Sequence, residues 1–198
     1  SSLYANAAKS FKMPTFTQIY GGGGANFAAN PLLEPEEGWT YEFGYKKTSN
    51  TSMFKAALYY MDLDTIEYEG KGTSSNPYVT RNMSFKNKGL EMTYEKDFGS
   101  KYSYSLGANF CNPMGKNKKG VWERKFAREQ YNAGIKYHDA KFNAALTGMF
   151  TTDRASGWGD LLPVNFIAGY KFDKSSSVEL GVENIFDRDD IVSNPGSA

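Results

Sequence analysis

Cationic and aromatic side chains between the predicted strands are the residues of this sequence best suited to bind a ligand. Ammonium and guanidinium groups pair with anions, and aromatic rings beside them add cation–π contacts. Stretches between regular elements are also where recognition residues concentrate. The candidate ligand contacts are Trp122, Arg124, Arg154 and Trp158, and an earlier stretch adds Tyr20 and Phe27. Attraction of the same cations to an anionic lipid surface, or simple solvation, stays an open alternative.

A cluster of carboxylates near the end of the sequence could bind calcium. Asp187, Asp189 and Asp190 follow a predicted strand, and calcium prefers carboxylate oxygens as ligands. However, the cluster lacks the glycine-turned loop of a calcium site, and Arg188 interrupts it. We therefore favour a solvated rim and predict no metal site and no cofactor.

No constellation of side chains typical of an enzyme is present in the sequence. Nucleophilic hydrolysis needs a histidine near a serine or an aspartate, and the only histidine, His138, falls in a short predicted turn. Cys111 is the only cysteine, so it has no disulfide partner, and no base is placed to activate it. The glycine run 21–24 lacks the helix and the Lys-Ser/Thr pair of a phosphate-binding loop. We therefore predict that the protein is not an enzyme.

The elements that position these residues are predicted strands with one apolar and one polar face. From Trp39 onward every second residue is aromatic, and a similar alternation recurs over 102–110, 131–137 and 164–172, where only Ile167 departs from it. Period-two alternation is typical of β-strands. A soluble sandwich and a barrel surrounded by lipid would both show it, and the aromatic residues near the strand ends favour the barrel.

Turn residues divide the chain into about nine predicted strands whose connections alternate in length. The strands are predicted at 2–11, 38–48, 52–67, 81–97, 101–112, 128–138, 141–152, 162–173 and 176–186. Short connections follow the second, fourth, sixth and eighth of them, and long connections follow the first, third, fifth and seventh. Short turns at one rim and long loops at the other are typical of bacterial outer-membrane barrels. A soluble Greek-key sandwich has no reason to keep that alternation.

The composition is compatible with such a barrel and excludes several other classes. The 198 residues can form one domain, and a net charge of +1 gives no reason to expect a nucleic-acid partner. The mean hydropathy is −0.58, and no apolar run approaches the roughly 20 residues of a membrane helix. Barrel strands escape this criterion because half of their residues are polar.

Three segments resemble the C-terminal half of a TonB-dependent outer-membrane receptor. Tyr4–Thr15 resembles a family strand that ends in an aromatic, a basic and a small residue before proline. Asn30–Glu36 resembles the Asn-Pro-x-Leu-x-Pro-Glu segment that leads into a strand with a Glu-x-Gly core, here Glu42 to Gly44. Gly181–Asp189 is similar to the family's penultimate strand with its Glu-Asn-Leu-Phe-Asp ending. Together these segments extend the resemblance over nearly the whole chain.

The resemblance implies an all-β fold, an antiparallel transmembrane β-barrel portion with short periplasmic turns and long extracellular loops. Residues 1–198 would be the C-terminal portion of a roughly 22-stranded barrel, with the plug domain and the final strand absent. No signal peptide precedes the first predicted strand, so we expect a fragment of an exported protein. The polar face would line the lumen with Glu42, Lys46, Glu91, Glu95, Lys136, Lys171, Glu179 and Glu183.

The resemblance also implies a function, which is the import of a scarce ligand across the outer membrane of a Gram-negative-type bacterium. A ferric siderophore is the expected ligand, and the expected partners are outer-membrane lipid and the energy-coupling protein TonB, reached through the missing N-terminal region. Cobalamin and haem are alternative ligands, although the stretch 21–30 lacks the histidine that haem receptors often carry there. A small self-contained barrel with a structural or adhesive role is a second alternative.

Overall fold

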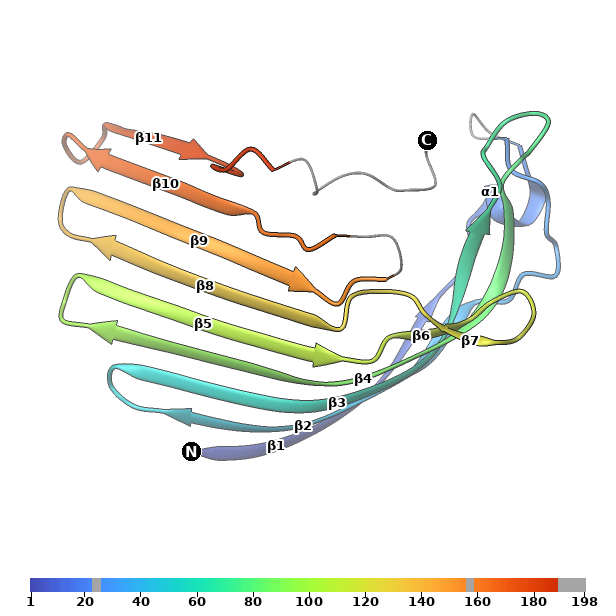
Figure 1. The fold of residues 1–198 in the computed structure, drawn as a ribbon, viewed down its shortest axis with the longest axis horizontal. Coiled ribbons are helices and arrows are strands. Elements are labelled where there is room, and N and C mark those ends of the chain that lie inside the picture. The colour runs from blue at the N-terminus through green and yellow to red at the C-terminus, as the bar shows by residue number, and fades with distance from the viewer. Residues whose placement is uncertain (23–25, 156–158, 189–198) are drawn as a thin grey trace.

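The computed structural model describes residues 1–22, 26–155 and 159–188. They form one curved antiparallel sheet in which strands that follow each other in the chain lie side by side (Figure 1). The main path of the sheet consists of β1 (Ser2–Lys12), β2 (Glu36–Thr48), β3 (Ser52–Glu69), β4 (Val79–Phe98), β5 (Tyr102–Cys111), β8 (Glu129–His138), β9 (Phe142–Thr152), β10 (Val164–Lys171) and β11 (Ser177–Val182). The all-β antiparallel prediction is confirmed.

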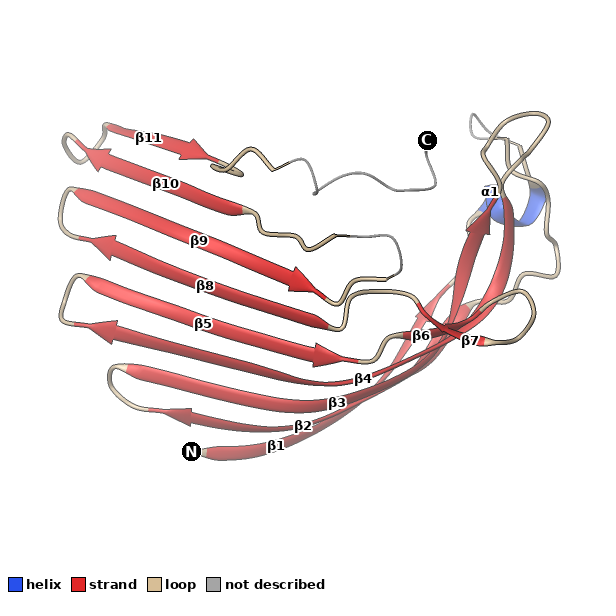
Figure 2. Cartoon of the chain, viewed as in Figure 1, coloured by secondary structure: helices blue, strands red, loops and turns tan. Residues whose placement is uncertain are grey.

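Three short elements were not predicted from the sequence. The helix α1 (Phe16–Tyr20) follows β1, and the strands β6 (Met114–Lys116) and β7 (Trp122–Arg124) form a small hairpin beside β4 (Figure 2). At Thr15, a capping box starts α1, because its hydroxyl accepts from the amide of Gln18 while the Gln18 side chain accepts from the Thr15 amide. These elements lie in stretches that the sequence predicts to be long loops.

The register of the sheet keeps the polar and apolar side chains on separate faces. Pairing between β3 and β4 runs without interruption from Ser52 opposite Lys96 to Glu69 opposite Val79. Because every strand pair is continuous in this way, the predicted lumen-lining residues within strands share one face, which we call the inward face. Glu183 lies just beyond the end of β11. Leu58, Leu106 and Ala133 lie on the opposite, outward face.

On the inward face, aromatic rings pack over glycine residues of a neighbouring strand. A side chain at Gly44 would place its Cβ 2.2 Å from the ring of Tyr4, and a side chain at Gly89 would place its Cβ 2.5 Å from the Tyr59 hydroxyl. The Tyr59 hydroxyl donates a hydrogen bond of 3.0 Å to Oδ1 of Asn109. These strand glycines therefore serve a packing purpose, since they leave room for a ring from a neighbouring strand.

Aromatic residues on the outward face gather at two levels along the strands. One group lies seven to nine residues from the short-turn end of its strand and consists of Trp39, Tyr41, Tyr60, Phe110, Tyr131 and Phe150. The other lies within about four residues of that end and consists of Tyr45, Phe54, Tyr94, Tyr102, Tyr104, Tyr137, Phe142 and Tyr170. The band between the two groups is occupied by aliphatic side chains such as Leu58, Ala108 and Ala133, together with the rings of Phe43 and Phe166. Two aromatic girdles around an apolar band are typical of transmembrane barrels.

The sheet has almost no core of its own. Among the described residues, the buried apolar side chains are few, namely Leu33, Ala57 and Pro113. Large apolar side chains such as Leu58 and Leu106 are more than half exposed, at 58% and 51%. No helix in the described ranges has the length and hydropathy needed to cross a membrane.

The face assignment predicts that arginine destabilises the barrel at one of two adjacent positions of β8 and is tolerated at the other. Ala133 lies on the outward face near the middle of the strand, and Asn132 lies on the inward face and is exposed. Ala133→Arg should destabilise the assembled barrel by roughly 2–4 kcal/mol, because a charge at that depth would face lipid. Asn132→Arg should cost little. The measurement is urea unfolding of the whole receptor in vesicles, and equal losses for both variants would contradict the face assignment.

Candidate functional site

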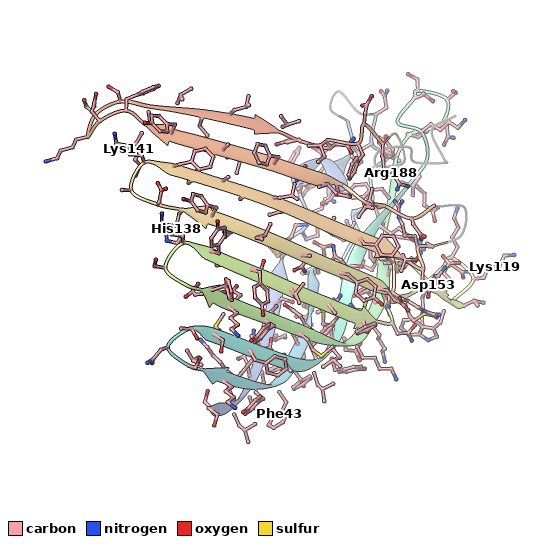
Figure 3. All side chains as sticks on the ribbon, turned by 60° about the vertical axis from the view of Figure 1, so that its left-hand side comes forward. Phe43, Lys119, His138, Lys141, Asp153 and Arg188 are labelled. Atoms are coloured by element: carbon pink, nitrogen blue, oxygen red, sulfur yellow. The ribbon has the colours of Figure 1, made fainter. Side chains whose placement is uncertain are left out.

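The candidate ligand-binding residues belong to the rim at which the long connections lie. Figure 3 shows Lys119 and Asp153 at this rim, and His138 and Lys141 at the opposite rim of short turns. The sheet extends furthest at the long-loop rim in the β3–β4 hairpin, whose strands have 18 and 20 residues. The connections on either side of this hairpin fold against it.

The segment 13–35 packs against the β3–β4 hairpin and holds two of the candidates. Its backbone pairs with Tyr78, the residue just before β4. The amide of Ala28 donates to the Tyr78 carbonyl at 2.8 Å, and the amide of Tyr78 donates to the Asn26 carbonyl at 3.1 Å. The side chain of Asn30 donates to the Thr80 carbonyl at 2.8 Å. This contact covers Thr80, which is only 1% exposed.

The two aromatic candidates of this segment differ in their surroundings. Phe27 packs between Tyr68 and Tyr78, with ring centroids 5.8 Å and 5.3 Å away. Tyr20 is 64% exposed at the end of α1 and contacts the ring of Phe16 at 4.6 Å between centroids. Phe27 therefore anchors the segment to the hairpin, whereas Tyr20 presents its ring to the surroundings.

The β6–β7 hairpin is bound to the inward face of β3 and β4 by ion pairs. Lys125 contacts Glu67 at 2.8 Å and Glu123 at 2.9 Å, and its side chain is only 16% exposed. Arg81 pairs with Glu67 and with Glu69, and Lys118 also pairs with Glu69. We call these six residues the hairpin ion network. It carries three positive and three negative charges, so the charges balance within it.

The ion pairs shift the pKa values of the two network residues that lie on or beside β7. The ammonium of Lys125 holds the pKa of Glu123 below its ordinary value, and a hydrogen bond from Asn117 acts in the same direction. For Lys125, burial lowers the pKa, but the carboxylates of Glu67 and Glu123 outweigh burial and raise it. Both shifts favour the charged forms that make the contact.

The sequence did not identify the network because its members come from separate segments, and two of them, Glu69 and Glu123, were predicted to lie in loops rather than strands. Glu69 falls in a predicted loop at 68–80, and Arg81 and Glu67 were expected only as strand ends. The structure extends β3 to Glu69 and starts β4 at Val79, which places Glu67 opposite Arg81 and Glu69 diagonally across from it. Glu67 and Glu69 continue the period-two pattern of the predicted strand 52–67, and this alternation is the signal that could have extended the prediction to Glu69.

Trp122 lies on the outward face, between two lysines. Its ring is 5.6 Å from Nζ of Lys86 and 5.4 Å from Nζ of Lys116. Lys86 is opposite Asp62, which in turn is opposite Trp39 of the upper aromatic group. The cation–π pairing that the sequence suggests for Trp122 is therefore present, and its partners belong to the side of the sheet that carries the aromatic girdles.

Arg124 connects the β6–β7 hairpin to the end of β9. Its guanidinium donates to the Asp153 carbonyl at 3.2 Å, pairs with the Asp153 carboxylate and donates to the carbonyl of Arg154. Arg154 in turn donates to the Gly159 carbonyl at 2.8 Å. The structure thus brings Arg124 and Arg154 together, as neighbours across two loops. Trp158 lies outside the described residues.

The positions of His138 and Cys111 agree with the structural roles that the sequence indicates for them. His138 lies at the short-turn rim, where its amide donates to Lys101 at 2.8 Å. The Cys111 thiol lies on the inward face, 3.4 Å from the Ala127 carbonyl. No group of three or more potential metal ligands forms among the described residues, and the predicted cluster is only partly covered because Asp189 and Asp190 lie outside them.

The pKa shifts predict that the β6–β7 hairpin is held most firmly between about pH 4.3 and pH 10.4, the ordinary values of Glu and Lys. The pKa of Glu123 is lowered in the folded state, so its contribution is present above about pH 4.3 and is lost as the pH falls through the folded pKa. The pKa of Lys125 is raised, so its contribution is present below about pH 10.4 and is lost as the pH rises through the folded value. Hydrogen exchange of residues 114–126, corrected for intrinsic rates, should show lower protection outside this window, and constant protection would contradict it.

Removal of one ammonium should loosen the same hairpin. Lys125→Met takes away the partner of two carboxylates in a half-buried site, which should cost roughly 1–3 kcal/mol locally. Lys119→Met is the matched control, because Lys119 is exposed and makes no ion pair within the described part of the chain. Hydrogen exchange of residues 114–126 should accelerate in the first variant and stay unchanged in the control. The same exchange in both variants would show that the network does not hold the hairpin.

Solved structures share the fold of this chain. The copper transporter OprC superposes with a TM-score of 0.70 at 14% identity, over 94% of this chain and 31% of OprC. The siderophore receptor PirA from Pseudomonas aeruginosa gives 0.66 at 17% identity, over 94% of this chain and 33% of PirA. A variant of the ferric enterobactin receptor PfeA from the same organism gives 0.69 at 17% identity, with the same coverage. The chain therefore spans about a third of the length of the receptors it matches.

A family model identifies the chain independently of these superpositions. The model of the TonB-dependent receptor-like β-barrel matches residues 1–185, which is nearly all of the sequence. The predicted order of strands, the alternating lengths of the connections and the separation of the two faces agree with that match. The chain belongs to the TonB-dependent receptor β-barrel family.

Proposed function

We propose that the chain is part of an outer-membrane TonB-dependent receptor that imports a ferric siderophore. The family match over residues 1–185 carries the proposal. Members of this family are transporters rather than enzymes, and they reside in the outer membrane of Gram-negative bacteria. Energy would come from TonB through a region outside this chain.

The ligand class rests on the charges at the long-loop rim and on the names of similar proteins. PirA, PfeA and the ferric-catecholate receptor Fiu of E. coli K12 are described as siderophore or ferric-siderophore receptors, whereas OprC is described as a copper transporter. Many ferric siderophores are anionic, and cationic side chains at the rim suit an anion better than a bare cation. The cationic rim therefore favours a ferric siderophore over copper.

Within the candidate set, the joined pair Arg124 and Arg154 offers the best anion contact. The Arg124 guanidinium is held by Asp153 and by the Arg154 carbonyl, so its position is fixed before a ligand arrives. A fixed guanidinium loses little entropy on binding, and charge-assisted hydrogen bonds to an anion are strong. Of the other candidates, Tyr20, Trp122 and Trp158 would supply further ring contacts, whereas Phe27 would act indirectly by holding the segment 13–35 against the β3–β4 hairpin.

The first test is deletion of the whole receptor gene in the source bacterium under iron limitation. Uptake of radiolabelled iron should fall for one ferric siderophore in a panel of catecholates and hydroxamates, and the full gene should restore it. Uptake of haem, cobalamin and copper is measured in parallel. A loss confined to one of those three would replace the siderophore by that ligand, and no loss for any ligand would contradict the import function.

The second test concerns the arginine pair. Arg154→Ala should weaken binding of the ferric siderophore by roughly 10- to 100-fold, the value of one charge-assisted hydrogen bond. Lys171→Ala is the matched control, because it removes one positive charge at the short-turn rim of the inward face. Affinity is measured by fluorescence quenching on the purified whole receptor. Equal affinities in the two variants would exclude Arg154 as a ligand contact.

A further inference from the structure

Two lysines face each other across neighbouring strands at the short-turn rim. Tyr170 of β10 is opposite Phe142 of β9. The next pair toward the rim is Lys171 and Lys141, whose backbones are joined by a hydrogen bond of 2.7 Å from the Lys171 amide to the Lys141 carbonyl. Both lysines share the inward face with Ser177 of β11, which is opposite Lys171, because the rings of the preceding pair lie outward. Like charges that are directly opposite each other destabilise a sheet, so an anion between these ammonium groups would be favourable.

The lysine pair lines a hollow at the end of the sheet, at the rim where Figure 3 shows Lys141. The hollow has a volume of about 540 Å³ and lies between the turn before β9 and the turn that joins β10 to β11. Lys174 and the three serines at 175–177 belong to its lining. Ammonium and hydroxyl groups are hydrogen-bond donors, so the hollow suits an anion with several oxygen atoms. We call Lys141, Lys171, Lys174 and Ser177 the rim notch.

The aspartates of the two adjoining turns are engaged by other groups. Asp173 also lines the hollow, but its Oδ1 accepts from the amide and hydroxyl of Ser175, both at 2.8 Å, and from the amide of Ser176 at 2.9 Å. Asp139 of the turn before β9 lies 3.8 Å from Nζ of Lys101. These carboxylates therefore stabilise their own turns rather than the ammonium groups of the rim notch.

Glu179 is a further carboxylate on this part of the inward face. It is opposite Gly169, one step above the row of Lys171 and Ser177, so it is only a diagonal neighbour of Lys171. In the described ranges, no ion pair involves Lys141, Lys171 or Lys174. The rim notch thus presents three ammonium groups that carboxylates of the described chain do not pair with.

The position of the rim notch indicates which anion it meets. Short turns lie on the periplasmic side of outer-membrane barrels, so a notch on the inward face borders the periplasmic mouth of the lumen and not the lipid. Every inward residue of β9 and β10 above it is uncharged, namely Asn143, Ala145, Thr147, Met149, Thr151, Asn165, Ile167 and Gly169. An anion that moves down this wall would therefore meet no carboxylate before it reaches the lysines.

We propose that the rim notch is an exit site, which binds the anionic ferric complex as it leaves the lumen. The ammonium groups would pair with the negatively charged oxygens of the complex, and the hydroxyl of Ser177 would donate a further hydrogen bond. This inference rests on the proposed import of an anionic ferric siderophore and adds a weak second contact at the rim opposite the candidate ligand site. Because the exit site acts after release from the long-loop rim, loss of Lys171 should leave the affinity at that rim unchanged.

The first experiment measures binding at the rim notch without requiring transport. The purified whole receptor is acetylated with an amine-reactive reagent, and the rate of modification of each lysine is read by mass spectrometry. A ferric tris-catecholate, which is anionic, should slow modification of Lys141 and Lys171 about tenfold at ten times its Kd for the notch. A ferric tris-hydroxamate, which is neutral, should not slow it. Lys47 is the internal control, because it lies at the same rim on the outward face.

Three results of this experiment would overturn the proposal. They are the absence of slowing by the anionic complex, equal slowing at Lys47, and lysines of the notch that do not react even without the complex. The last result would show that another part of the receptor covers the notch.

The second experiment measures transport. In the test variant, Lys141, Lys171 and Lys174 are each replaced by glutamine. Uptake of the ferric siderophore at saturating concentration should fall about tenfold, because a cationic lining raises the local concentration of an anion by at least that factor. The affinity of the purified receptor, measured by fluorescence quenching, should stay the same. Replacement of the same three lysines by arginine should restore most of the uptake.

The matched control removes the same charge from the outward side of the same rim, through Lys47→Gln, Lys96→Gln and Lys101→Gln. It should import as the wild type does, and heat-modifiable migration on gels verifies that every variant is an assembled barrel. Normal uptake by the notch variant, equal loss in both triple variants, or a parallel loss of affinity would overturn the exit site. A wild-type receptor that imports no ferric siderophore would instead contradict the proposed function, and the acetylation experiment would still decide whether the notch binds the anionic complex.

Discussion

An unbroken hydrogen-bond register is the constraint on which this structure depends. Side chains alternate between the two faces of a strand, so a slip of one residue would move every outward residue of that strand to the inward face. Continuous pairing from β1 to β11 prevents such a slip and keeps Glu91 and Lys136 on one face while Leu106 and Ala133 stay on the other. The described residues form a single-layer sheet with few buried side chains, so no hydrophobic core within it could correct such a slip in register.

The β3–β4 hairpin extends that register beyond the rest of the sheet and receives support on both faces. Phe27 and Asn30 attach the segment 13–35 to one side, and the hairpin ion network attaches β6 and β7 to the other. The two supports differ physically. Rings and backbone hydrogen bonds hold the first and are insensitive to salt, whereas the ion pairs of the second weaken at high ionic strength and at extreme pH. The site at the rim is therefore supported by one contact that is insensitive to salt and by another that depends on ionic strength and pH.

The sequence predicted the strands better than it predicted the contacts between loops. Alternation over Trp39 to Tyr45 determines a strand and its faces locally, so residue types alone suffice there. The contact of Lys125 with Glu67 joins residues 58 positions apart, and only the folded sheet brings them together. The same is true of Trp122, whose pairing with cations could be predicted while its outward direction could not. The short helix α1 depends on its capping box and its packing rather than on apolar periodicity, which five residues cannot display.

The pairing of the strands also determines their slope. One row of facing residues runs through Tyr45, Ala56, Met92, Ala108, Tyr131 and Phe150. It begins three residues from the short-turn end of β2 and finishes eight residues from that end of β9. The row therefore shifts by about five residues, or roughly 17 Å along the strands, while it crosses five strand spacings, or roughly 24 Å of sheet. This ratio corresponds to strands that are inclined by about 35° to the barrel axis. At that inclination the 10 residues of β5 or β8 rise about 28 Å, close to the roughly 25 Å apolar band of such barrels. The additional length of β3 and β4 must therefore project beyond the apolar band of the membrane.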